Sequence, residues 1–283
     1  MNVSSDQTRV SALILTLDEE ANIGNCIDSL QWCDDIVVLD SYSQDRTVDI
    51  AREKGARVFQ REFDNYARQR NYGLNDIEYK NSWLIMVDAD EVTPPDLATE
   101  IGQAINNSSD NVCLFRMRRK DYFLGQWIRR SSGYPTWFGR LIKIGKVSVE
   151  REINEEYVTD GEVGLLEAHL HHYPFNKGFS WWVARHNRYS TMEAENKLAS
   201  HEQPLPLLSL FSRDPTLRRK KIKQIVYSLP GRPLIIFLGL YIIRGGILEG
   251  RAGLTFCLLK AFYEFLISCK LQELERRQHG QNI

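Results

Sequence analysis

Cysteine is scarce in this chain, and the few cysteines form no recognisable pair. The 283 residues include five cysteines, none in a Cys-x-x-Cys motif, and most of them lie in apolar stretches. We therefore expect reduced, buried thiols in a cytosolic protein.

Residues 1–9 are polar and lack an apolar signal core, so we expect no export. Repeats and low-complexity tracts are also absent, and 43% hydrophobic with 26% charged residues is typical of a soluble globular protein.

Long apolar runs are missing as well. Residues 233–243 are uncharged but number only eleven, whereas crossing a bilayer takes about 20. Residues 253–269 are apolar around most of a helix but contain Lys260 and Glu264. We expect two helices that lie in a membrane interface, form a platform for a partner chain, or pack as ordinary core. The polar tail from Gln272 is expected to fray.

The net charge of −1 hides an uneven distribution. Residues 213–232 contain seven basic groups and one aspartate, a net charge of +6 that leaves −7 elsewhere. Such a cluster suits an anionic membrane surface, where each basic residue adds about 1 kcal/mol of attraction. A solvated helix face is the plainer alternative. Nucleic acid is not an expected partner, because no aromatic-interleaved binding module accompanies the cluster.

The first ninety residues alternate between strand and helix patterns. Apolar runs at residues 10–16, 35–40, 56–59 and 83–88 predict strands, and helical patterns separate them. Such alternation implies right-handed crossovers and a mostly parallel sheet flanked by helices, an α/β fold.

Acidic residues follow these strands and should share one edge of the sheet. They are Asp18, Asp40, Asp45, Asp88 and Asp90. Open α/β sheets bind ligands at this edge. Asp88 and Asp90 are two positions apart, so their side chains share one face of an extended strand and could hold a divalent cation that clamps a diphosphate. Taken alone, Asp-x-Asp is more often a turn that closes a strand.

Three of these segments together resemble the nucleotide-sugar domain of family 2 glycosyltransferases, which have the GT-A fold. The matching segments are Thr16–Ile23, Val38–Thr47 and Val87–Glu91. Within that family the chain is most similar to bacterial enzymes that extend the lipopolysaccharide inner core, and the similarity runs almost to its end. It includes the pairs Arg70-Asn71, Arg140-Leu141 and His172-Tyr173, and the segment Phe123–Trp127.

The resemblance implies inverting transfer of a hexose from a nucleoside diphosphate sugar, with UDP-glucose as the expected donor. The acceptor would be a lipopolysaccharide core or another lipid-linked glycan. Mg²⁺ or Mn²⁺ held by Asp88 and Asp90 would neutralise the departing diphosphate. Asp40 would bond the nucleoside base. The full set of expected donor contacts is Thr16, Asp18, Glu19, Asp40, Asp45, Arg70, Asp88, Arg140 and His172.

One departure from the family concerns the expected base. The related enzymes typically have His-Glu where this chain has Asn154-Glu155. We expect Glu155 to take the proton of the acceptor hydroxyl, with Glu152 and Glu156 as competitors. If the missing histidine did this work, the chain would be a catalytically impaired, membrane-docked scaffold.

His172 has two open interpretations. As a late histidine it would contact the cation or the diphosphate, as known among GT-A enzymes. A hard cation held by two aspartates needs no imidazole, however, and packing beside Tyr173 and Phe175 would be purely structural. Residues 116–137, rich in arginine and aromatics, are the expected acceptor loop, since their cations suit phosphates. Trp181 and Trp182 are expected in the core.

The sequence thus predicts a GT-A domain over residues 8–205. A basic and apolar helical extension over residues 206–283 would dock on the inner face of the cytoplasmic membrane. A metal-dependent nucleotidyltransferase would share the acidic edge. Such an enzyme normally carries a Gly-rich, basic loop after its first strand, and Leu17–Glu20 argues against it.

Overall fold

The computed structural model describes residues 9–150, 156–199, 206–211, 221, 225, 229 and 231–282. It divides into two compact units. The N-terminal unit comprises Met1–Arg129 and Gly133–Lys177, and the C-terminal unit comprises Arg130–Ser132 and Gly178–Ile283.

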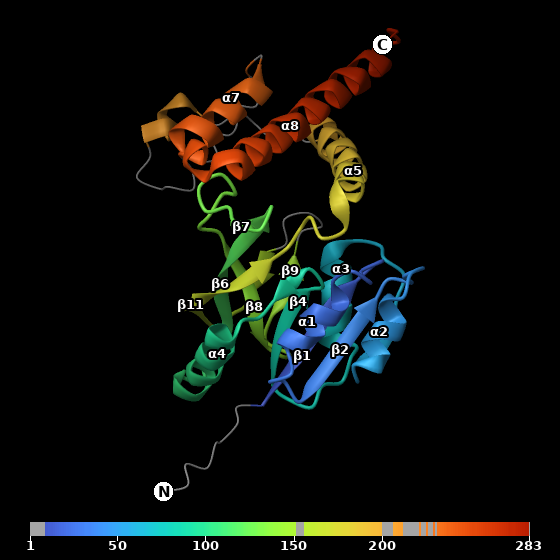
Figure 1. The fold of residues 1–283 in the computed structure, drawn as a ribbon, viewed down its shortest axis with the longest axis vertical. Coiled ribbons are helices and arrows are strands. Elements are labelled where there is room, and N and C mark those ends of the chain that lie inside the picture. Colours follow the sequence, from blue (N-terminus) through green and yellow to red (C-terminus); the bar gives the residue numbers. More distant parts are fainter. Residues whose placement is uncertain are drawn as a thin grey trace, which may run out of the picture. The chain divides into compact units, whose positions relative to one another are not determined.

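The N-terminal unit begins with a parallel half-sheet. Strands β1 (Val10–Thr16), β2 (Asp35–Asp40), β3 (Arg57–Gln60) and β4 (Trp83–Asp88) lie in the order β3-β2-β1-β4, all parallel (Figure 1). Helices α1 (Ile23–Ser29), α2 (Thr47–Glu53) and α3 (Tyr66–Asn75) make the connections. The predicted α/β alternation is confirmed.

The other half of the sheet is mixed. Strand β8 (Trp137–Lys143) lies antiparallel between β4 and β6 (Val112–Phe123). Beyond β6 come β11 (Glu162–His172), parallel to β6, and the short β5 (Glu91–Val92), antiparallel to β11. Strand β7 (Gln126–Trp127) pairs with β6, and helix α4 (Pro95–Asn107) follows β5. A separate hairpin joins β9 (Ser148–Glu150) to β10 (Glu156–Val158).

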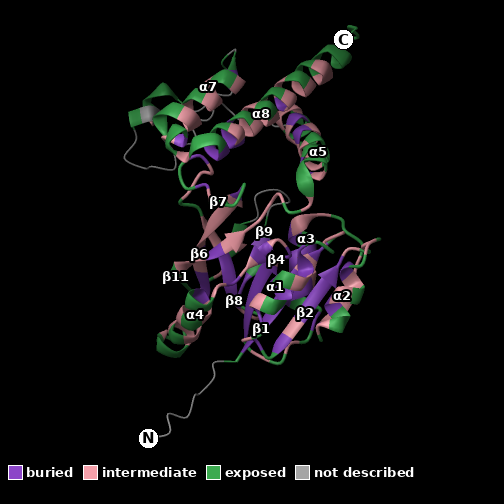
Figure 2. Cartoon of the chain, viewed as in Figure 1, coloured by how far each residue is buried: buried purple, intermediate pink, exposed green. Residues whose placement is uncertain are grey.

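Both faces of the sheet are covered, which explains why its central strands are continuous apolar runs. On one face Ala12 and Ile14 pack with α1, α2 and α4, and on the other Leu13 and Met86 pack with α3 and β9. Figure 2 shows the central strands β1, β2 and β4 as mostly buried. Successive side chains of β1 thus serve opposite cores, as the pleat of a strand requires.

The register of the strands aligns their polar ends. Thr16 lies opposite Asp40, and Leu15 lies opposite Asp88. The ends of β1, β2 and β4 therefore form the acidic edge that the sequence predicts. The mixed half of the sheet adds to this edge, because His172 at the end of β11 pairs with Glu91 of β5.

The C-terminal unit is helical. It contains α5 (Gly178–Ala199), the 3₁₀ turn η1 (Leu207–Phe211), α7 (Arg232–Leu238), the π-helical turn η2 (Gly239–Ile243), the 3₁₀ turn η3 (Gly246–Glu249) and α8 (Gly250–Gln278). The two expected apolar helices are present. Gly245 and Gly250 between them have positive φ angles of 77° and 59°, which glycine adopts without strain.

Two expectations about this unit differ from the structure. Helix α8 continues to Gln278 through the region expected to fray, where Glu273 and Arg277 form an i,i+4 ion pair. Helix α5, which the sequence assigns to the catalytic domain, belongs to the C-terminal unit because it packs on α8. His186 meets Tyr263 edge to face, and Lys270 bonds to Asn187. Trp182 is buried and stacks on His186, as expected of a core residue.

One stretch of the described residues is long and apolar enough to cross a membrane, judged by length and composition alone. It is Gly246–Gln278, whose most apolar 18-residue window has a mean hydropathy of 1.4 and is 28% buried. A core helix of a soluble protein passes the same test, so this is weak evidence for a span.

Candidate active site

Asp40 closes β2 and holds the loop that follows it. Its carboxylate is fully buried and accepts hydrogen bonds from the hydroxyls of Thr16 and Ser43, the backbone N–H of Ser43 and the amide of Gln60. A carboxylate accepts about four hydrogen bonds, so protein donors already fill this one. In the structure Thr16 and Asp40 therefore support the loop, and the expected contact of Asp40 with a nucleoside base stays a prediction.

The loops after β1 and β2 are joined by reciprocal hydrogen bonds. Asp18 donates its backbone N–H to the Ser43 hydroxyl at 2.8 Å and accepts from the backbone N–H of Gln44 at 2.7 Å. Asp45 accepts from the backbone N–H of Glu20 at 3.0 Å. Burial raises the pKa of Asp45, but hydrogen bonds from Thr47 and Glu20 outweigh it and lower that pKa overall. These carboxylates give the two loops one fixed shape.

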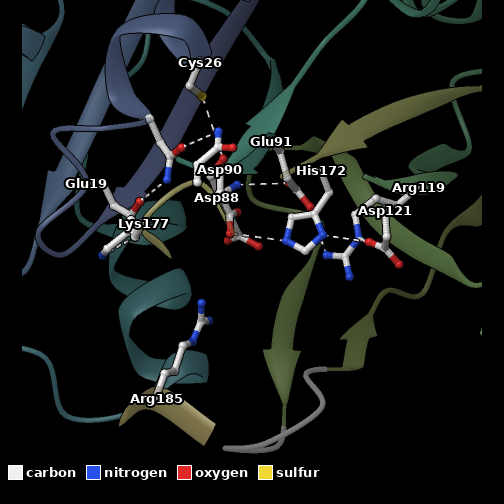
Figure 3. Close-up of polar contacts among 12 residues, drawn as sticks. Glu19, Cys26, Asp88, Asp90, Glu91, Arg119, Asp121, His172, Lys177 and Arg185 are labelled. Carbon is white, nitrogen blue, oxygen red and sulfur yellow. Dashed lines mark hydrogen bonds and ion pairs between the residues drawn. The ribbon is translucent and has the colours of Figure 1, made fainter. Parts of the chain in front are cut away.

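Glu19 connects the start of α1 to the chain after β11. Its carboxylate pairs with Lys177 at 3.0 Å and accepts from the Asn22 amide at 2.8 Å (Figure 3). Burial raises the pKa of Glu19, and these two partners only partly offset it. Asn176 bonds to Asn22 at 2.9 Å and extends the link. Sequence reasoning missed Lys177 and Asn176, because a separation of more than 150 residues from their partners leaves no local pattern.

A cavity of about 440 Å³ lies beside this link. It is lined by Asn22, Asn25, Ala89, Asp90, Val92, Tyr173 and Asn176. Its amide, hydroxyl and carboxylate groups suit a polar, hydroxylated ligand.

Asp88 is neutralised by two arginines. Arg70 of α3 and Arg140 of β8 each place Nη2 2.8 Å from one of its carboxylate oxygens. Arg140 also bonds to Glu91 at 2.8 Å. Burial raises the pKa of Asp88, but Arg140 and Arg70 hold it well below its usual range. Both arginines are only 3% exposed and pair with Asp88, and their expected contact with the donor stays a prediction.

Asp90 has a different partner. Its Oδ2 lies 3.2 Å from Nε2 of His172, and Nδ1 of the same ring lies 2.7 Å from Oδ1 of Asp121 (Figure 3). Burial and Arg119 lower the pKa of His172, yet the two carboxylates outweigh them and raise it to about 9. The structure thus places His172 beside Asp90 and brings in Asp121, which sequence reasoning missed.

The residues at this point fit a divalent cation in part. Asp90 and His172 offer a carboxylate oxygen and an imidazole nitrogen, both ligands of Mn²⁺. Within the part of the chain that the structure describes, no three His, Cys, Asp or Glu side chains are grouped to hold a metal ion. A cation here would therefore take its remaining ligands from water or from a bound diphosphate, as Mg²⁺ commonly does.

The expected base falls outside the described part of the chain. Glu152, Asn154 and Glu155 lie outside the described residues. Glu156 opens β10 and is exposed. Strand β9, which ends just before this segment, is held by Asn71, whose amide exchanges two hydrogen bonds with the backbone of Val149 at 2.7 and 2.9 Å.

The expected acceptor region forms a layer of cations over aromatic rings. Arg118 lies 4.8 Å from the ring centre of Trp137, and Lys120 and Arg129 lie 5.0 and 5.5 Å from that of Trp127. Such layers suit anionic saccharides, because rings stack on sugars and cations pair with phosphates. The assignment of this region to the acceptor stays a prediction.

The pairing of Asp88 predicts a large effect of losing Arg140. Arg140→Met leaves the buried Glu91 and the partly exposed Asp88 with one cation fewer, so the free energy of unfolding should fall by about 3 to 5 kcal/mol. Arg46→Met is the matched control: its pair with Glu53 spans 3.7 Å with both side chains about two-thirds exposed, and its loss should cost less than about 0.5 kcal/mol. Urea titration of both variants measures the difference, and equal costs would contradict the buried pairing.

Comparison with known proteins identifies the family. The sequence profile of glycosyl transferase family 2 matches residues 11–158. The chain is 28% identical to the lipopolysaccharide core biosynthesis glycosyltransferase LpsC of Rhizobium meliloti, over 97% of this chain and 96% of that protein. It is 24% identical to the uncharacterized glycosyltransferase RP128 of Rickettsia prowazekii, over 97% and 90%.

Solved structures give a weaker match. Glucosyl-3-phosphoglycerate synthase of Mycobacterium tuberculosis, in complex with Mn²⁺, uridine diphosphate and glucosyl-3-phosphoglycerate, is 24% identical with a TM-score of 0.35. The match covers 40% of this chain and 44% of that one, so the chain spans less than half of its length.

The family profile covers more than half of the chain, from β1 through β10, and its residues build the acidic edge of the parallel sheet. The protein belongs to glycosyl transferase family 2 and is a glycosyltransferase.

Proposed function

We propose that the protein transfers a hexose from a nucleoside diphosphate sugar, with UDP-glucose the expected donor, to a lipopolysaccharide-core or lipid-linked glycan with inversion at the anomeric carbon. The observation that carries the donor side is the polar edge of the sheet, where two fixed loops adjoin Asp90 and His172. The acceptor class rests on the similarity to LpsC, which extends over nearly the whole of both chains.

On the donor side, the loops after β1 and β2 would receive the nucleoside and Asp90 the diphosphate. Asp18, Glu19 and Asp45 hold these loops in one shape, so the site needs little reorganisation when the donor binds. Both oxygens of Asp88 accept from arginines, and we therefore assign the cation, Mg²⁺ or Mn²⁺, to Asp90 and His172. When bound, the cation supplies a Lewis acid for the charge on the leaving diphosphate.

On the acceptor side, we assign the base to Glu155. Its carboxylate would take the proton as the acceptor hydroxyl forms its bond to the anomeric carbon and the bond to the diphosphate breaks on the opposite face. The basic side chains and aromatic rings of β6, β7 and β8 would hold the anionic glycan: the rings would stack on its sugars and the basic groups would pair with its charges.

The role of Glu155 is testable by an isosteric change. Glu155→Gln should bind UDP and Mn²⁺ like the wild type but transfer sugar about 10² to 10⁴ times more slowly, since a positioned proton acceptor contributes that much. Asn154→His should change the rate only modestly. The measurement is the initial transfer rate of the three proteins at saturating donor. A wild-type rate for Glu155→Gln would move the base elsewhere, with Glu152 and Glu156 next to be tried.

We further propose that the C-terminal unit docks the protein on an anionic membrane surface at the cytoplasmic side. The turn between α7 and α8 carries large apolar side chains toward solvent, with Ile243 85% and Leu248 71% exposed. Arg244 and Arg251 are exposed at the same turn, and the basic cluster at 213–232 precedes it in the sequence. Apolar insertion flanked by cations is the combination that binds an interface of anionic lipid.

The exposed side chains of helix α8 also suit contact with a membrane. Its exposed apolar residues Leu254, Leu258, Phe262 and Phe265 recur every three or four positions, which places them on one side of the helix. The charge on Glu249 is directed inward, because its carboxylate accepts from the backbone of Arg130 and from Ser131. The turn therefore presents apolar and basic groups outward.

A double substitution at the turn tests this docking. Ile243→Ser with Leu248→Ser should lower binding to phosphatidylglycerol vesicles at least about tenfold, because burying each such side chain is worth about 1.5 to 3 kcal/mol. Leu165→Ser, at a 57% exposed position of β11, is the control and should bind normally. Co-sedimentation at low and high salt gives the affinities. Full binding by the double variant, or none by the wild type, would contradict the proposal.

A further inference from the structure

His172 lies between two carboxylates that have different surroundings. Asp90 is on the loop after β4, lines the cavity described above and approaches Nε2 at 3.2 Å. Asp121 is near the end of β6 and approaches Nδ1 at 2.7 Å, on the opposite side of the ring. All three side chains are largely buried, with exposures of 13% to 18%.

The geometry determines which nitrogen can face a cation. An imidazole binds a metal ion through a nitrogen lone pair, so its proton must then be on the other nitrogen. The nitrogen next to Asp90, which lines the cavity, is Nε2. The proton must therefore be on Nδ1, and Asp121 is the acceptor placed to receive it.

Asp121 is itself held in place. Arg119, two residues earlier on the same strand, donates its Nε–H to Oδ1 of Asp121 at 3.0 Å. The guanidinium also reaches Glu91 at 3.3 Å, which links it to the carboxylate that accepts from Arg140. Neighbouring positions of β6 turn the other way: Arg118 and Lys120 lie over Trp137 and Trp127. Because successive side chains of a strand point to opposite faces, Arg119 and Asp121 lie on the side of His172, and Arg118 and Lys120 lie on the side of the aromatic rings.

We propose that Asp121 is a positioning residue: it fixes His172 in the tautomer whose Nε2 lone pair, together with Asp90, binds the divalent cation of the donor complex. A carboxylate that accepts a hydrogen bond from the second ring nitrogen of a metal-binding histidine commonly orients the ring in this way and raises its basicity. The inference rests on the cation site of the proposed function. It adds a residue that would touch neither the cation nor the substrate.

The test measures cation binding as well as turnover. Titration calorimetry of UDP with and without Mn²⁺ should give a Mn²⁺ affinity about 10 to 100 times weaker in Asp121→Ala than in the wild type, the usual cost of losing such an acceptor. Asp121→Asn keeps an acceptor oxygen and should lose less. Glu167→Ala is the matched control: it removes another carboxylate bonded to a β6 arginine, in this case Arg118, and should leave Mn²⁺ affinity unchanged.

A second readout separates positioning from folding. Long-range ¹H–¹⁵N spectra of histidine-labelled protein with UDP and Mg²⁺ should show His172 protonated at Nδ1 alone in the wild type and in Asp121→Asn. Asp121→Ala should show both tautomers. Wild-type Mn²⁺ affinity in a folded Asp121→Ala, or the other tautomer in the wild type, would overturn only the proposed role of Asp121 and leave the cation site in place. UDP binding that ignores Mn²⁺ in the wild type would overturn the cation site as well.

Discussion

The neutralisation of Asp88 by two buried arginines is the interaction on which the site depends. A carboxylate at the end of a central strand is costly to bury unless its charge is matched. Arg70 comes from α3 on one side of the sheet and Arg140 from the neighbouring strand β8, so satisfying Asp88 fixes both elements against β4. Arg140 then holds Glu91, whose other oxygen accepts from the backbone N–H of Asp88 at 3.1 Å. The loop that carries Asp90 is thereby closed by charge and hydrogen bonds.

The mixed half of the sheet places further polar side chains beside this loop. Because β5 pairs antiparallel with β11, His172 is set beside the Asp88–Glu91 loop although it lies more than 80 residues downstream. Strand β6 runs parallel to β11 with His172 opposite Asp121, which brings the second carboxylate to the ring. The loop after β4 thus supplies Asp90, β11 supplies His172 and β6 supplies Asp121, and the chain after β11 returns to the start of α1 through Lys177. In our account the parallel half binds the donor and the mixed half holds the charge of its diphosphate.

Much of this arrangement could be predicted from the sequence, because it depends on local patterns. The apolar runs fixed the strands of the parallel half, and the carboxylates after them marked the edge. The sequence also singles out Arg70, Arg140 and His172, but it does not predict that the two arginines pair with Asp88 or that His172 also contacts Asp121. A sequence indicates that Asp88 needs a cation nearby without saying whether that cation is a metal ion or a guanidinium, since the choice depends on how β8 pairs with β4. Asp121 and Lys177 were missed because their roles exist only through pairings between distant segments.

The central claim is that the donor complex places a divalent cation between Asp90 and His172 while Asp88 stays with its arginines. Crystals grown with UDP and Mn²⁺ and measured at the manganese absorption edge test this directly. We expect one anomalous peak about 2.1 to 2.3 Å from both the Asp90 carboxylate and Nε2 of His172, with the diphosphate completing the coordination. A peak coordinated by Asp88 instead, or UDP bound in full occupancy with no anomalous peak at Asp90, would contradict it.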